Sequence, residues 1–128
     1  MHPDLGRLVV RSVREGEGIM PMQFAVPGIT DADLASMRPW YWSKELSHDA
    51  QAAQFHIEVR SYVMQVDGLN VLIDSCCGNG KIRSVPWADR LQTDWLGQLG
   101  RAGYRPEDIH LVLCTHLHAD HVGWNTRL

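Results

Sequence analysis

The clearest periodic pattern along the chain predicts a β-hairpin. Residues from Phe55 to Val66 largely alternate between apolar and polar side chains, as in a strand with one buried face. Asp67-Gly68, a two-residue turn signal of the type I′ class, follows, and the mainly apolar segment from Leu69 to Asp74 returns. When the two strands pair directly across this turn, Ser61 lies opposite Asp74. The hairpin would therefore carry Asp74 to the end of the sheet.

Two further elements are predicted downstream. Four apolar residues recur at every fourth position, namely Trp87, Leu91, Trp95 and Leu99. This spacing predicts a helix with one apolar face, and Gly103 is a suitable residue to end it. After a turn at Arg105-Pro106-Glu107-Asp108, the run from Ile109 to Cys114 is apolar except for His110. We expect this run to be a buried strand.

The N-terminal part carries weaker signals. Residues 7–14 alternate weakly and suggest a first strand, whereas residues 15–30 contain three glycines and two prolines and are expected to form a loop. Thr30 is a good cap for a short helix that begins with acidic residues and ends before Pro39. Trp40-Tyr41-Trp42 is an aromatic cluster, either a cover packed on the core or one wall of a substrate cleft.

Composition is that of an ordinary globular protein. Hydrophobic residues make up 45% and charged residues 21% of the 128 residues, and the formal net charge is −3. Runs of Lys or Arg are absent, which gives no support to a nucleic-acid partner. No stretch reaches the roughly 18 apolar residues of a membrane helix, and the N-terminus lacks the apolar core of a signal peptide. We therefore expect no membrane partner and a cytoplasmic location. The three cysteines have no zinc-ribbon spacing, and a structural disulfide is not expected.

Candidate chemistry is concentrated near the end of the sequence. Three histidines and one aspartate fall within six positions, as His116, His118, Asp120 and His121. Imidazole nitrogen and carboxylate oxygen are ligands that suit zinc, iron, nickel and manganese. Residues two apart in extended chain point to the same side, so His116 and His118 could bind one ion. A turn at Ala119 would let Asp120 and His121 face a second ion about 3.5–4 Å away. The alternative is a polar loop that is His-rich by chance.

The segment from Thr115 to Gly123 resembles the signature loop of the metallo-β-lactamase-fold superfamily of metallohydrolases. Val71-Leu72-Ile73-Asp74 resembles the first motif of this family, a strand that ends in an aspartate beside the metal site. The segments Cys76–Lys81 and Trp124–Thr126 are similar to a subgroup that includes lactonases of the quorum-quenching type. The resemblance extends from about Phe55 to Leu128 and corresponds to the N-terminal half of the family's domain.

The resemblance implies an α/β (α+β) fold, as half of an αββα sandwich. The expected organisation is a single partial domain over residues 1–128, truncated after the His-x-His-x-Asp-His motif. Complete members continue with another histidine ligand, a bridging aspartate and a final histidine, none of which follows here. A truncated chain would leave a sheet edge exposed, through which a homo-oligomer could form.

The resemblance also implies roles for the site residues. His116 and His118 would hold one metal ion, and Asp120 and His121 the other, with Asp120 also assigned as catalytic. Two zinc ions are expected in the complete domain, although Mn²⁺, Fe²⁺, Co²⁺ or Ni²⁺ would also suit these ligands. Asp74 and Thr115 would contact the ligand side chains, without binding metal themselves, and orient them. For Asp74 the alternative is a simple cap at the end of a strand.

The implied reaction is hydrolysis of a lactone or another ester, in which a metal-bridging hydroxide attacks the carbonyl carbon. The substrate would be a small molecule. Members that act as thioesterases, phosphodiesterases or β-lactamases remain alternatives. A further alternative is a truncated, non-catalytic fragment that binds metal weakly or needs a partner chain.

Overall fold

The protein is described from a computed structural model that defines residues 8–40 and 49–127, except for the side chain of Trp40. Its elements are β1 (Val9–Pro21), α1 (Met22–Ala25), α2 (Asp31–Met37), β2 (Gln54–Val66), β3 (Leu69–Ile73), α3 (Trp95–Arg101), β4 (Leu111–Leu113), and 3₁₀ turns at Arg38–Trp40, Pro86–Ala88, Pro106–Asp108 and Gly123–Asn125. Tyr41 and Trp42 of the predicted aromatic cluster lie outside the described residues. No helix in the described ranges is long and apolar enough to cross a membrane.

The chain divides into two compact units. The first contains the residues up to Gly16 and those from Glu58 onward, and the second contains Glu17–Ile57. Strands β1 and β2 therefore each contribute residues to both units. All of the predicted site residues belong to the first unit.

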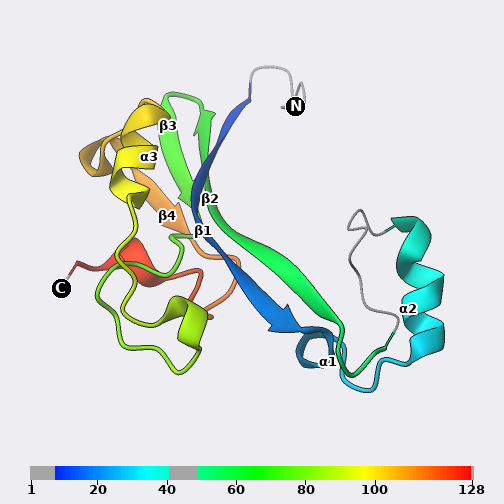
Figure 1. Ribbon diagram of the computed structural model, residues 1–128. Helices are drawn as coiled ribbons and strands as arrows, with labels where there is room; N and C mark the ends of the chain where they lie inside the picture. The colour runs from blue at the N-terminus through cyan, green and yellow to red at the C-terminus, as the bar shows by residue number, and fades with distance from the viewer. Residues whose placement is uncertain (1–7, 41–48, 128) are drawn as a thin grey trace. The chain divides into compact units, whose positions relative to one another are not determined.

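Four strands form one mixed sheet in the order β1-β2-β3-β4 (Figure 1). The predicted hairpin is confirmed, since β2 and β3 are antiparallel and Val66 pairs with Leu69. Asp67 and Gly68 both have positive φ, 48° and 80°, as a type I′ turn requires. Strand β4 lies parallel to β3. Parallel pairing places the carboxyl ends of β3 and β4 at the same edge of the sheet.

The core of the first unit joins the sheet to α3. Its buried residues are Val13, Val59, Val63, Leu72, Cys76, Cys77, Ala88, Trp95 and Leu99. Helix α3 ends at Arg101, and Gly103, the predicted stop residue, follows with φ 96°. Tyr104 N–H then donates to the Leu99 carbonyl at 3.1 Å. The core therefore anchors the segment that directly follows β3.

The predicted helix from Trp87 to Leu99 is wrong over its first half, because α3 begins only at Trp95. Apart from the 3₁₀ turn at Pro86–Ala88, the preceding segment forms hydrogen bonds to a neighbouring loop and makes no α-helical turn. The Asp89 carboxylate accepts from Arg83 N–H at 2.7 Å, and Arg90 N–H donates to the Lys81 carbonyl at 2.7 Å. Both Trp87 and Leu91 still pack against the core, so their spacing is explained by contact with the core and not by a continuous helix.

The predicted strand at Ile109 to Cys114 is confirmed as the shorter β4, but the expectation that it is buried is wrong. Leu111, Val112 and Leu113 have exposed fractions of 48%, 40% and 47%. Within the described part of the chain, β4 is the last strand of the sheet and pairs with β3. Its side chains therefore lack a covering layer among these residues.

The second unit has a small core of its own, formed by Met22, Ile29, Leu34, Ala50 and Ala53. The cap of α2 is confirmed: the Thr30 hydroxyl accepts from Asp33 N–H, and the Asp33 carboxylate accepts from Thr30 N–H. The loop predicted at residues 15–30 is partly wrong, because β1 continues to Pro21 and α1 follows it. Gly16 and Gly18, which suggested a loop, lie within a strand.

Candidate metal centre

The candidate site forms where β3 and β4 end. Asp74 directly follows β3, and Thr115 follows β4 after one residue. A hydrogen bond of 2.8 Å from Asp74 N–H to the Leu113 carbonyl continues the pairing of the two strands beyond their ends. Two loops therefore leave the sheet together: a support loop, residues 74–78, and a ligand loop, residues 115–121.

Asp74 is the link between these loops. Its carboxylate accepts hydrogen bonds from Thr115 N–H at 2.8 Å and from the Thr115 hydroxyl at 2.8 and 3.0 Å, and it lies 2.9 Å from His121 Nδ1. Only 7% of Asp74 is exposed. Burial opposes ionisation, but the hydrogen bonds from His121 and Thr115 outweigh it and lower the pKa of Asp74 below its usual value. The side chain is therefore an ionised acceptor beneath the ligand loop.

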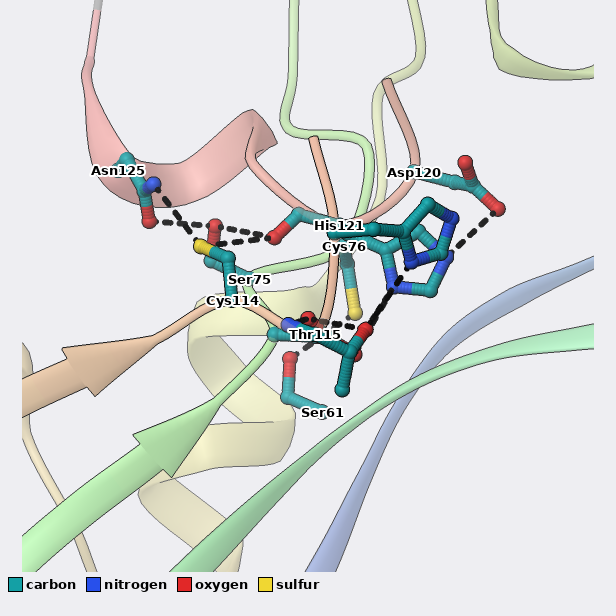
Figure 2. Close-up of polar contacts among 10 residues, drawn as sticks. Ser61, Ser75, Cys76, Cys114, Thr115, Asp120, His121 and Asn125 are labelled. Carbon is teal, nitrogen blue, oxygen red and sulfur yellow. Dashed lines mark hydrogen bonds and ion pairs between the residues drawn. The ribbon is translucent and has the colours of Figure 1, made fainter. Parts of the chain in front are cut away.

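The histidine rings of the ligand loop lie close together. The ring centroid of His116 is 4.5 Å from that of His118 and 3.9 Å from that of His121. On the far side of its ring, His121 Nε2 is 3.4 Å from Asp120 Oδ2. Figure 2 shows the Asp120 and His121 side chains joined in this way, with Thr115 beneath them. The four predicted ligands thus form one continuous cluster.

The donor types of this cluster fit a divalent metal such as zinc. Because Nδ1 of His121 faces Asp74, its Nε2 is the nitrogen left for a ligand, and the carboxylate–histidine pair is the usual support of a metal-bound imidazole. Thr115 plays a similar part beside His116, since its hydroxyl lies 3.1 Å from His116 Nδ1. Nevertheless, no three Cys, His, Asp or Glu side chains among the described residues converge on a single point that could hold an ion.

The backbone of the support loop contacts the backbone at the end of the ligand loop and in the residues that follow it. Ser75 N–H donates to the His121 carbonyl at 2.8 Å, and Trp124 N–H donates to the Ser75 carbonyl at 2.9 Å. A methyl group on Gly78 would lie 2.6 Å from the Gly123 carbonyl oxygen, and one on Gly123 would overlap the backbone of Cys77. Both positions therefore require glycine.

The cysteines of the support loop are packing residues. Cys76 and Cys77 are buried and unbonded to each other, and Cys76 Sγ lies 3.0 Å from the Ser61 hydroxyl. Burial raises the pKa of Cys76 to about 12, and burial together with the charge of Glu15 raises the pKa of Cys77. Both side chains are therefore neutral thiols at neutral pH, which is a poor state for nucleophilic or redox chemistry.

Sequence reasoning missed some residues of the site. The Ser75 hydroxyl donates to Asn125 Oδ1 at 2.7 Å and so ties the support loop to the end of the chain. Glu15, on β1, contacts the support loop as well. Neither residue has a local pattern that signals these contacts, because their partners are about fifty residues or more away in sequence. His110, just before β4, has a different contact, since its Nδ1 accepts from Asn70 N–H at 3.0 Å.

Comparison with known proteins identifies the family. The family model of the metallo-beta-lactamase superfamily matches residues 55–128, which include both loops of the site. The chain belongs to the metallo-beta-lactamase superfamily. A search of curated proteins found no match.

Solved structures of this superfamily's fold resemble the chain over most of its length. AidC, described as a dizinc quorum-quenching lactonase, is 19% identical with a TM-score of 0.65, covering 93% of this chain and 36% of AidC. A probable metal-dependent hydrolase from Staphylococcus aureus is 20% identical with a TM-score of 0.66, covering 91% of this chain and 40% of that one. A quorum-quenching N-acyl homoserine lactone lactonase is 18% identical with a TM-score of 0.57, covering 91% and 40%.

The TM-scores of 0.57–0.66 establish a shared fold, the mixed α/β fold of metallo-beta-lactamase hydrolases. The chain spans 36–40% of the length of the three structures.

Proposed function

We propose that this chain carries part of the metal centre of a hydrolase that opens a lactone or another ester. The observation that supports this proposal is the continuous cluster of His116, His118, Asp120 and His121, held from below by the ionised Asp74. Imidazole and carboxylate groups gathered at the ends of two parallel strands are suited to bind divalent metal, with zinc as the first candidate.

Each side chain has a defined part in this proposal. His116 and His118 hold one ion, while His121 and Asp120 hold a second, and Asp120 is the catalytic carboxylate. Asp74 keeps the proton of His121 on Nδ1, which leaves the Nε2 lone pair free to bind metal. Thr115 orients both Asp74 and His116 through its hydroxyl. Bound divalent metal would polarise the substrate carbonyl and lower the pKa of water to about 7, which supplies a nucleophile at neutral pH.

Lactones are the first substrate class to test. Likeness in fold to structures described as lactonases supports this choice, although thioesters, phosphodiesters and β-lactams suit the same metal chemistry. The purified chain would be assayed against representatives of all four classes, with and without added zinc or manganese. We expect metal-dependent hydrolysis that is largest for a lactone.

The matched control is the double variant His116→Ala/His118→Ala. It removes two exposed imidazoles from the ligand loop without touching the buried support loop. Turnover by the unchanged chain that requires metal and is lost in this variant would support the proposal. Equal turnover by the two proteins would contradict it.

A second candidate is a fragment that binds metal weakly and needs a partner chain for catalysis. The exposed side chains of β4 and the 82% exposure of Leu117 favour it, because a covering layer would normally bury such residues. This candidate predicts poor catalysis and self-association through the open sheet edge in size-exclusion chromatography. A monodisperse monomer with robust metal-dependent hydrolysis would exclude it.

A further inference from the structure

A carboxylate outside the metal motif holds the support loop in place. Glu15, on β1, is half-buried and accepts hydrogen bonds from four groups: Cys77 N–H at 2.7 Å, Gly78 N–H at 3.2 Å, the Thr93 hydroxyl at 3.3 Å and the Trp124 indole N–H at 2.7 Å. These donors come from three separate segments of the chain, and all of them are uncharged. One side chain therefore fastens the support loop to the segment that follows the ligand loop.

The backbone of the support loop is shaped to receive an anion. Cys76 and Gly78 have positive φ, 51° and 77°, on either side of Cys77. Alternation of this kind turns consecutive N–H groups toward one side, where they form a concave binding site for a negative charge. The N–H groups of Cys77 and Gly78 indeed converge on the two oxygens of Glu15. Since left-handed backbone is unfavourable for a residue with a side chain, Glu15 compensates a conformation that Cys76 would otherwise avoid.

The support loop is also hydrogen-bonded to the backbone of His121 and of the residues that follow it. Ser75 N–H donates to the His121 carbonyl at 2.8 Å, and Gly123 N–H donates to the Cys76 carbonyl at 2.6 Å. Trp124 is bound twice, through its backbone to Ser75 and through its indole to Glu15. Glu15 thus binds both segments of a backbone pair, of which one begins with Asp74 and the other with His121, its neighbour at 2.9 Å.

We propose that Glu15 is a positioning residue for the candidate metal centre: its carboxylate holds the support loop against residues 121–124, and so sets the place of Asp74 and His121. This inference rests on the proposed function, because it assigns Glu15 a purpose in metal binding. Glu15 itself touches none of the four proposed ligands in the contacts described above.

The test compares Glu15→Gln with the unchanged 128-residue chain. Glutamine has the same shape but replaces one acceptor oxygen with an amide donor, so at least one of the N–H groups of Cys77 and Gly78 would face another donor. Glu107→Gln is the matched control, since it makes the same chemical change on an exposed residue of the same unit. Two properties would be measured for each protein: hydrogen–deuterium exchange without metal, and zinc affinity by titration.

We expect Glu15→Gln to accelerate exchange on the order of 10-fold in peptides covering residues 74–78 and 121–125, the scale expected for loss of a hydrogen bond to a charged group. Exchange in the β2–β3 ladder should be unchanged, whereas a general loss of stability would accelerate it too. The zinc dissociation constant should rise about 10-fold. Glu107→Gln should match the unchanged chain in both measurements.

Unchanged exchange in both loop peptides would overturn the proposal, and so would faster loop exchange with unchanged zinc affinity. Absence of zinc binding by the unchanged chain would instead refute the proposed function, and with it any role of Glu15 in metal binding. If Glu15→Gln does not fold, Trp124→Phe removes one of the four hydrogen bonds and keeps an aromatic ring beside Trp95, whose centroid is 5.1 Å from that of Trp124. The same two peptides should then exchange faster, and wild-type exchange there would overturn the proposal.

Discussion

The support loop and the ligand loop meet at one site but are built in opposite ways. All five residues of the support loop are buried, two of its non-glycine residues have positive φ, and its backbone N–H groups bind other segments. In the ligand loop, residues 115–118 are exposed, and Leu117 is 82% exposed. In the proposed function, the exposed ligand loop carries the metal donors, and the buried support loop beneath it holds them in place through its backbone hydrogen bonds.

The largest expected effect comes from forcing the two loops apart. In Gly123→Ala the new methyl group would overlap the backbone of Cys77, which cannot move without breaking the bonds of the support loop. We expect a loss of more than about 3 kcal/mol in the free energy of unfolding, at or beyond the upper range for overpacking. Urea denaturation followed by tryptophan fluorescence would measure it.

Gly80→Ala is the matched control for this substitution. Gly80 also has positive φ, 70°, but a methyl group there would meet no atom within 4 Å. Its cost should be limited to about 1–2 kcal/mol for a left-handed alanine. Equal losses in the two variants would show that backbone strain, and not contact between the loops, limits stability here.

The two loops also differ in how well the sequence predicts them. The ligand loop follows from local spacing, because His116, His118, Asp120 and His121 lie within six residues, and the hairpin register brings Asp74 to the same edge. The contacts of the support loop join residues more than forty positions apart, such as Ser75 and His121 or Cys77 and Glu15. No periodicity encodes such contacts. The false helix before Trp95 has a similar cause, since Trp87 and Leu91 are apolar for contact with the core and not for helical packing.

The next largest effect concerns the ligand loop itself. We expect His116→Ala/His118→Ala to abolish high-affinity zinc binding, because the proposed function gives both imidazoles to one ion. Isothermal titration calorimetry with zinc would measure this. The unfolding free energy should change by less than about 0.5 kcal/mol, since both side chains are exposed. Unchanged stoichiometry and affinity would refute the assignment of these ligands.

Asp74 lies between the two loops, and an intermediate effect is expected. Asp74→Ala should weaken zinc affinity about 10–100-fold, the usual result of removing the partner of a metal-bound histidine. It should also reduce stability, because Thr115 N–H loses its acceptor and alanine tolerates the φ of 55° poorly. Zinc titration and urea denaturation would measure the two effects.

Asp74→Asn separates these two causes. Asparagine adopts left-handed backbone more readily than alanine and keeps an acceptor oxygen for Thr115, but it has no charge to hold His121. We therefore expect most of the stability to return while zinc affinity stays low. Wild-type affinity in both variants would remove Asp74 from the metal centre and leave it as a cap at the end of β3.

The smallest effect is expected at Leu117, where a substitution tests whether the ligand loop contributes to the stability of the fold. If the ligand loop adds no packing, then a large apolar residue within it can be replaced by a polar one at little cost. Leu117→Ser should change the unfolding free energy by less than about 0.5 kcal/mol, because 82% of Leu117 is exposed.

Leu99→Ala, in the core beneath the sheet, is the control and should cost about 2–5 kcal/mol in the same denaturation experiment. A comparable loss in both variants would mean that Leu117 is covered in solution, for example by a second copy of the chain. Size-exclusion chromatography of Leu117→Ser would then show a smaller assembly than that of the unchanged protein.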